Sequence, residues 1–226
     1  MIATLENTLI LIPVYNSYQH LIKLHQRIFR ASPKCNLFCV NDGSTDLSLE
    51  MIKILQINYI SFEENRGKGH ALKTGFTYAK ENNYQFVITL DSDLQHSPAY
   101  LRNFFIVQNK EKADMVIGFR SFNIHNMPLT RVMSNYLTST ILSHKTGKLI
   151  LDSQSGFRMY NLQYFDADKL QTNRYQTETE LLLSYISQNA KIAHTEIPVI
   201  YGNEISHISY LRDIQNFCKL MIKEWK

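Results

Sequence analysis

Short apolar runs alternate with segments of helical periodicity along the first half of the chain. Residues 9–14 (Leu-Ile-Leu-Ile-Pro-Val) form a continuous apolar run, which is typical of a strand buried on both faces of a sheet. Residues 18–31 then place Leu21, Leu24 and Ile28 at helical spacing and stop before Ser32-Pro33. This succession predicts βαβ units and a mostly parallel sheet.

The same alternation of apolar runs and helical segments continues to residue 118 and is less regular after it. It predicts strands at residues 36–40, 59–62, 85–90 and 114–118, and helices at residues 46–56, 68–82 and 98–110. Further on we expect helices at residues 128–147 and 176–189 and a strand at residues 192–200. We therefore predict one α/β domain over residues 1–207 and a C-terminal amphipathic helix over residues 208–226, which either lies on a membrane surface or packs on the domain.

Two aspartates follow the predicted strand at residues 85–90. Side chains two positions apart on a strand point to the same face, so we expect the carboxylates of Asp91 and Asp93 to lie together. Adjacent carboxylates repel each other unless a cation or a proton is shared between them. One interpretation is a divalent metal site, and the other is a polar strand end before a helix that Ser97 caps and Pro98 begins.

Polar residues gather at the ends of several predicted strands. Asn16, Asp42, Asp91 and Asp93 all lie at or just past a strand end, where open α/β sheets bind their ligands. The Gly-rich, cationic segment 64–73 precedes a helix, and a helix N-terminus attracts phosphate. That segment follows neither the Walker A nor the G-x-G-x-x-G spacing, so we expect a crevice of a different kind.

The composition is that of a globular protein with a mild positive charge. Of the 226 residues, 44% are hydrophobic and 19% are charged, and the net charge of +4 suits an anionic ligand or membrane surface. No basic stripe alternates with aromatic residues, which argues against nucleic acid. Cys35, Cys39 and Cys218 show no metal-like grouping and predict free thiols in a reducing compartment. We see neither a signal peptide nor an apolar run long enough to span a bilayer.

Six segments in this order resemble the motifs of the family 2 glycosyltransferases, which have the GT-A fold. They are Ile12-Pro-Val-Tyr-Asn16, Val40-Asn-Asp-Gly-Ser-Thr-Asp46, Asn65-Arg-Gly-Lys-Gly-His-Ala71, Leu90-Asp-Ser-Asp-Leu-Gln-His-Ser-Pro98, Gly118-Phe-Arg120 and Asp152-Ser-Gln-Ser-Gly-Phe-Arg158. The resemblance covers about residues 8–207. Within the family it is greatest to the dolichyl-phosphate mannosyltransferase and polyprenyl-phosphate glycosyltransferase branch.

The resemblance implies a metal-dependent, inverting transfer of a hexose from a GDP- or UDP-linked sugar to a polyprenyl or dolichyl phosphate. It assigns Mg²⁺ or Mn²⁺ to Asp91, Asp93 and Gln95, and makes His96 a neighbouring polar contact. The residues that it assigns to the nucleotide sugar are Pro13, Tyr15, Asn16, Asp42, Lys68, Asp91, Ser92, Asp93 and Gln95. Those that it places near the acceptor phosphate are Arg120, Arg131 and Ser134.

The acceptor decides whether a general base is needed. A lipid phosphate is already ionised and needs cations to position it, whereas a hydroxyl needs a base such as Asp152, Glu178 or Glu180. Glu178 and Glu180 match a family Glu-x-Glu-Leu-Leu segment, but residues two apart on a helix point in different directions. The catalytic set implied by the resemblance is therefore Asp93, Arg120 and Arg131, with Glu178 and Glu180 as candidates.

One residue departs from the family's pattern, and several alternatives stay open. His207 stands in a site-closing loop where relatives carry Lys or Arg, and Arg158 serves either the acceptor or the bracing of the sheet. We expect a cytoplasmic protein that meets the inner membrane face directly or through a membrane partner protein. The alternatives are a family 2 transferase with a glycan or other hydroxyl acceptor, and a non-catalytic protein that binds nucleotide sugars.

Overall fold

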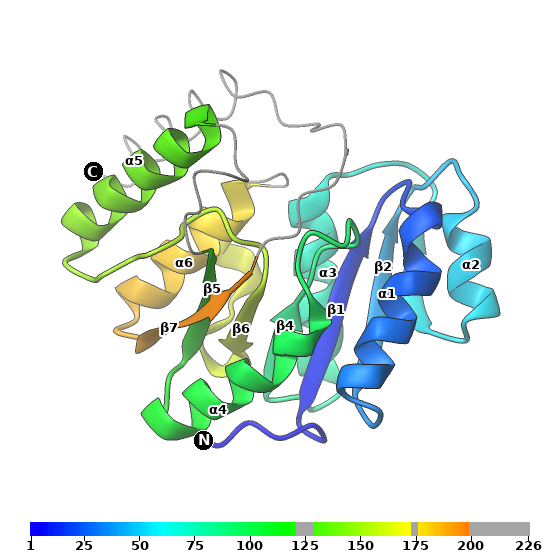
Figure 1. Cartoon of the computed structure of the whole chain (residues 1–226), viewed down its shortest axis with the longest axis horizontal. Helices are drawn as coiled ribbons and strands as arrows, with labels where there is room; N and C mark the ends of the chain where they lie inside the picture. Colours follow the sequence, from blue (N-terminus) through cyan, green and yellow to red (C-terminus); the bar gives the residue numbers. More distant parts are fainter. Residues whose placement is uncertain (121–128, 173–175, 199–226) are drawn as a thin grey trace.

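The protein is a seven-stranded α/β sandwich with helices on both faces of one sheet (Figure 1). The computed structural model describes residues 1–120, 129–172 and 176–198, without the side chains of residues 129–132. The strand order is β3-β2-β1-β4-β6-β5-β7. The strands are β1 Thr8–Val14, β2 Asn36–Asp42, β3 Asn58–Phe62, β4 Phe86–Thr89, β5 Met115–Arg120, β6 Arg158–Asn161 and β7 Ile192–Ile197. This mostly parallel sheet confirms the predicted α/β fold class.

The helices lie close to their predicted ranges. They are α1 Tyr18–Ala31, α2 Ser48–Ile54, α3 Lys68–Glu81, α4 Leu101–Glu111, α5 Leu129–Thr146 and α6 Gln176–Ser187, with short 3-10 turns at η1 Pro98–Tyr100, η2 Leu162–Tyr164 and η3 Ala167–Lys169. The helix predicted at residues 98–110 is divided into η1 and α4. No helix in the described ranges is both long and apolar enough to cross a membrane. The predicted helix over residues 208–226, and with it the domain boundary at residue 207, lies outside those ranges.

Alternation along the central strand divides the core into two layers. In β1, Ile10 and Ile12 pack with the side chains of α1, α2 and α4, whereas Leu9 and Leu11 pack on the opposite face with α3 and α6. The run at residues 9–14 is therefore apolar throughout because both of its faces are covered. Cys39 lies inside the first layer as a free thiol, as the sequence predicts.

The strand that the sequence pattern misses is β6. It runs antiparallel to β4 and β5 and separates them. Arg158 begins this strand, is fully buried, and donates through its guanidinium to the carbonyls of Ser155 (2.7 Å), Ser153 (2.6 Å) and Glu178 (2.9 Å). Of the two roles considered for Arg158, these contacts support the structural one, since they brace β6 against α6.

The carboxyl ends of β1, β2 and β4 meet at one edge of the sheet. These strands are parallel neighbours, so the residues that follow them face the same space, as the sequence predicts. Gly43 follows β2 with a φ of 66°, and a Cβ there would collide with the backbone of Glu64 and Asn65. Only glycine therefore allows the loop before α3 to approach the end of β2.

We expect Gly43→Ala to lower the free energy of unfolding by about 3 kcal/mol, because left-handed strain adds to a backbone clash. Gly147→Ala is the matched control, since Gly147 has a φ of 64° with open space around it. That control should cost only about 1 kcal/mol, from backbone strain alone. Urea denaturation of both variants measures the difference, and equal losses would contradict the close approach.

Candidate functional site

A half-buried lysine joins two carboxylates beyond the end of β4. The Nζ of Lys68 lies 2.6 Å from Oδ1 of Asp91 and 3.0 Å from Oε1 of Glu178. Lys68 is the first residue of α3 and Glu178 lies in the first turn of α6. One ammonium group therefore fixes three chain segments at the carboxyl edge of the sheet.

The charges in this cluster stabilise one another. Burial disfavours the charged form of Lys68, but the carboxylates of Asp91 and Glu178 outweigh it and raise the lysine pKa. Burial also opposes ionisation of Asp91, yet the ammonium of Lys68 holds the pKa of that carboxyl below its usual value. The cluster thus contains a permanent cation beside an ionised Asp91 at neutral pH.

Gly156 forms the floor beneath Asp91. A Cβ at Gly156 would lie 3.0 Å from Cγ of Asp91 and closer still to its Oδ2. The carbonyl of Gly156 accepts a hydrogen bond of 2.7 Å from the hydroxyl of Thr89, the last residue of β4. Gly156 belongs to the sequence motif at residues 152–158, but the motif alone does not indicate its role beside Asp91. The one sequence feature that could have indicated this role is the glycine itself, and its contact with Asp91 is hidden because the two residues lie far apart along the chain.

Asp93 lies in a turn and not on a strand. β4 ends at Thr89, and Leu94 adopts a φ of 63°, so the alternation argument that joined Asp91 to Asp93 does not apply. Oδ1 of Asp93 accepts a hydrogen bond of 2.9 Å from the backbone N–H of Gln95. The hydroxyl of Ser92 meets that of Ser17 at 2.7 Å, which ties this turn to the end of β1.

His96 is buried beside this turn, and it packs near the ring of Phe157 at a centroid distance of 5.8 Å. Burial lowers the pKa of His96 to about 4, so the imidazole is neutral at pH 7. Among the described residues, no hydrogen-bond partner reaches its Nδ1. His96 is therefore a neutral neighbour of the Asp91 cluster.

The donor set beyond β4 fits a metal that arrives with phosphate. No group of three or more His, Cys, Asp or Glu side chains forms a metal cage in the described ranges. Mg²⁺ is commonly held by one or two carboxylates together with substrate phosphates and water, so it does not need such a cage. Asp91 and Asp93, with the amide oxygen of Gln95, supply oxygen ligands of the required type.

Asp42 and Asn16 order the loops on the nucleotide side of the predicted site. The carboxylate of Asp42 accepts hydrogen bonds from the backbone N–H groups of Arg66 (2.9 Å) and Gly67 (2.8 Å). The side-chain oxygen of Asn16 accepts one from the backbone N–H of Thr45 at 2.8 Å. Tyr15 is largely exposed beside Asn16, and Pro13 is buried within β1. A base or ribose at Asp42 would share a carboxylate that already holds the loop before α3.

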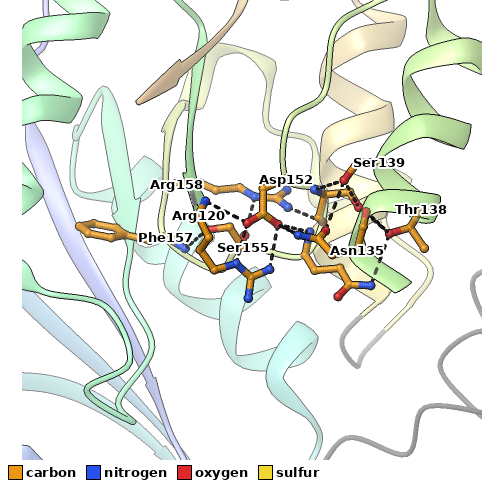
Figure 2. Close-up of polar contacts among 10 residues, drawn as sticks. Arg120, Asn135, Thr138, Ser139, Asp152, Ser155, Phe157 and Arg158 are labelled. Atoms are coloured by element: carbon orange, nitrogen blue, oxygen red, sulfur yellow. Dashed lines mark hydrogen bonds and ion pairs between the residues drawn. The ribbon is translucent and has the colours of Figure 1, made fainter. Parts of the chain in front are cut away.

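A second ion pair, more deeply buried than the first, lies at the end of β5. Nε and Nη2 of Arg120 donate to the two carboxylate oxygens of Asp152, at 2.6 and 2.9 Å (Figure 2). Asn135 of α5 and the backbone N–H of Gln154 donate to Oδ1 of the same carboxylate. Burial opposes the charge, but Arg120 holds the pKa of Asp152 below its usual value. An acceptor phosphate would therefore meet a guanidinium that is already paired.

The three carboxylates considered as bases all have partners. Asp152 is fully buried and paired with Arg120, and Glu178 is paired with Lys68. Both oxygens of Glu180 bind the loop before α6, through the backbone N–H groups of Gln171 (2.8 Å) and Thr172 (3.0 Å). Glu178 and Glu180 thus point to different partners, as their helical spacing predicts.

Two of the predicted acceptor residues belong to α5. Ser134 lies on its half-buried side, and its hydroxyl is 3.5 Å from the side-chain amide of Gln154. Arg131 lies in the first turn of α5, and its side chain is outside the described part of the structure. The predicted loop residue His207 is also outside the described ranges.

Comparison with known proteins identifies the class. Residues 9–170 match the family described as glycosyl transferase family 2. The chain belongs to this family, and it is a glycosyltransferase.

Relatives with named activities extend along nearly the whole chain. The chain is 28% identical to a UDP-N-acetylglucosamine–dolichyl-phosphate N-acetylglucosaminyltransferase of Methanococcus voltae, over 84% of this chain and 83% of the relative. It is 24% identical to a polyprenol monophosphomannose synthase of Mycolicibacterium smegmatis, over 97% of this chain and 87% of the relative.

A solved structure supports the fold. The glucosyl-3-phosphoglycerate synthase of Mycobacterium tuberculosis, crystallised with Mn²⁺, UDP and glucosyl-3-phosphoglycerate, superposes with a TM-score of 0.70 at 18% identity. The match covers 96% of this chain and 77% of that one. The expected GT-A fold and family are both confirmed.

Asp152→Asn tests the second ion pair. We expect this variant to lose about 3 kcal/mol of stability at pH 7, because it leaves the buried Arg120 without a counter-charge. The lowered pKa of Asp152 means that its contribution is complete above the reference value of 3.8 and is lost as the pH falls through the lower folded value.

The difference between wild type and Asp152→Asn should therefore persist at pH 5 and shrink below pH 3.8. Asp166→Asn is the control, since Asp166 forms an exposed ion pair with Lys169 at 3.5 Å. The control should change stability by less than about 1 kcal/mol. Denaturation curves across this pH range measure both, and similar losses in the two variants would contradict the role of Asp152.

Proposed function

We propose that this glycosyltransferase transfers a hexose from a GDP- or UDP-linked sugar to a polyprenyl or dolichyl phosphate, with inversion at the anomeric carbon and with a divalent metal ion. The observation that carries the proposal is the cluster of Lys68, Asp91 and Glu178 beyond β4. It places a cation and an ionised carboxylate at the sheet edge where ligands of open α/β folds bind. Relatives named for dolichyl-phosphate and polyprenol acceptors support the choice of acceptor.

The donor half of the site would work through charge. Asp91, Asp93 and Gln95 would hold Mg²⁺ or Mn²⁺, which supplies Lewis-acid stabilisation of the departing nucleoside diphosphate. Lys68 is held as a cation, so its ammonium would attract the diphosphate oxygens. The remaining predicted donor contacts are Pro13, Tyr15, Asn16, Asp42 and Ser92. Asp42 would keep the loop before α3 in place while it contacts the nucleoside.

The contacts of the candidate bases support a phosphate, and not a hydroxyl, as the nucleophile of the acceptor. Direct displacement with a hydroxyl nucleophile needs a base, but Asp152, Glu178 and Glu180 are all engaged by hydrogen-bond donors. A phosphate monoester is already ionised, so it needs cations to orient it and no proton removal. Arg120, Arg131 and Ser134 would supply that orientation at the junction of β5 and α5.

Nucleotide binding tests the donor half. We expect GDP or UDP to bind the wild type in the presence of Mn²⁺ and to bind at least about tenfold more weakly with EDTA or in Asp93→Ala, because a metal–phosphate contact is lost. Asp168→Ala is a control on the exposed 3-10 turn η3 and should bind normally. Isothermal titration calorimetry measures these affinities. Metal-independent binding by folded protein would contradict the assignment of Asp91 and Asp93.

Glu178→Gln separates the two acceptor classes. With a lipid phosphate we expect kcat to stay within about tenfold of wild type, because no base is removed, whereas loss of a general base costs roughly 10²–10⁴-fold. The transfer rate is measured from pH 5 to 9 with a polyprenyl phosphate. A much larger loss of kcat that also removes a basic limb from the pH profile would favour a hydroxyl acceptor.

A further inference from the structure

Both oxygens of the Asp91 carboxylate lie against other parts of the chain. Oδ1 is 2.6 Å from the ammonium of Lys68. Oδ2 faces the backbone of Gly156, where there is no room even for a Cβ. Asp91 is one of the proposed metal ligands, yet its oxygen farther from Gly156 is already paired with a cation of the chain itself.

The chain holds this ammonium in place from two sides. Oε1 of Glu178 lies 3.0 Å from the same Nζ, and Glu178 is buried in the first turn of α6. Lys68 begins α3 directly after Gly67, whose backbone N–H donates to the carboxylate of Asp42. Because its ammonium and the backbone before it both have partners, Lys68 should stay on Asp91 until another anion attracts it.

A divalent ion on Asp91 would be repelled by Lys68. Mg²⁺ lies about 2.1 Å from its oxygen ligands, so an ion on Oδ1 would come within about 5 Å of the Lys68 ammonium. This repulsion is stronger in a half-buried site than in water. A nucleoside diphosphate changes the balance, because its oxygens give the ammonium a new partner and give the ion further ligands.

We propose that Lys68 keeps free divalent ions off Asp91 and leaves that carboxylate when a nucleoside diphosphate arrives. The protein would then bind its metal ion as a complex with the nucleotide, and would not hold a resident ion between reaction cycles. The exchange needs only groups that already lie side by side. This inference rests on the metal and the nucleotide of the proposed function, but not on its acceptor.

Two other roles for Lys68 predict different behaviour. If Lys68 only fastens α3 to α6, its removal lowers stability and leaves the metal affinity unchanged. If it only adds positive charge to the site, a second change that restores the net charge also restores the metal affinity. Blocking of Asp91 differs from both roles, because it depends on which atoms the ammonium contacts.

Mn²⁺ binding without nucleotide tests the proposal. The full chain is titrated with Mn²⁺, and the free ion is measured by electron paramagnetic resonance. We expect weak binding by wild type and at least about tenfold tighter binding by Lys68→Met, because Asp91 loses its competing cation. At saturating Mn²⁺, the same variant should bind GDP or UDP at least about tenfold more weakly than wild type, because the diphosphate loses a charged partner.

The double variant Lys68→Met/Glu178→Gln separates blocking from net charge. It removes one ammonium together with one carboxylate, so the cluster keeps its net charge while Asp91 is open. We expect this variant to bind Mn²⁺ alone more tightly than wild type. It leaves no unpaired charge at Glu178, so it should fold even where Lys68→Met does not. Lys73→Met is the matched control on α3, since Lys73 binds the carbonyl of Leu170, and it should bind Mn²⁺ as wild type does.

Equal Mn²⁺ affinities of wild type and the double variant would overturn the proposal, whatever their stabilities. Tight binding of Mn²⁺ by wild type without nucleotide would also overturn it. So would a gain of Mn²⁺ affinity in Lys73→Met as large as that in Lys68→Met, or an unchanged nucleotide affinity of Lys68→Met at saturating Mn²⁺.

These outcomes are distinguishable from a failure of the proposed function. Metal-dependent nucleotide binding by wild type, without a gain of Mn²⁺ affinity in either Lys68 variant, would overturn the blocking role alone. If both Lys68 variants gain Mn²⁺ affinity but wild type transfers no sugar to a polyprenyl phosphate, blocking is supported and the proposed function is contradicted. A folded wild type that binds no nucleotide, with or without Mn²⁺, would contradict both.

Discussion

The ion pair between Lys68 and Asp91 is the interaction on which the geometry of the candidate site depends. The buried run of β4 carries a carboxylate to the sheet edge, where burial alone would favour its neutral form. Lys68 keeps Asp91 ionised and also reaches Glu178, so the starts of α3 and α6 are held beside the end of β4. Gly156 completes this arrangement, because any larger residue would displace Asp91.

The ion pair of Arg120 and Asp152 performs a comparable task at the end of β5. Asp152 joins the end of β5 to the inner face of α5, and Figure 2 shows it lying between Arg120 and Asn135. The buried face of α5 presents the amide of Asn135 and the hydroxyls of Thr138 and Ser139 beside the apolar Leu142. The hydrogen bond from Asn135 to Asp152 therefore helps to set which face of α5 is buried.

Much of the fold could be predicted from the sequence because most strands are continuous apolar runs and several helices have clear periodicity. β6 could not, because its segment Arg-Met-Tyr-Asn is short and begins with an arginine that is buried through hydrogen bonds to backbone carbonyls, one of them in α6. The strand ends that carry Asn16, Asp42 and Asp91 were predicted to share one edge, and they do. The relation of Asp93 to Asp91 was argued from strand alternation, which fails because β4 ends at Thr89 and Asp93 lies in a turn.

The partners of the charged residues were beyond sequence reasoning. Arg120 was assigned to a phosphate by resemblance, and nothing in the local pattern indicates that it binds Asp152, which lies far along the chain and is brought to it by tertiary folding. The partners of Glu180 could not be predicted either, since they are backbone groups of a loop. Pairings of this kind depend on tertiary approach, whereas strand ends and helix faces follow from local periodicity.

The most direct test of the central claim is a transfer assay with purified full-length protein, Mn²⁺, a polyprenyl phosphate, and GDP- and UDP-linked hexoses supplied separately. The product is identified by mass spectrometry, and its anomeric configuration by NMR. The account predicts a hexosyl polyprenyl phosphate of inverted configuration from one nucleotide class, and no product with EDTA. Transfer only to a hydroxyl acceptor, or a lipid product formed equally well without metal, would contradict it.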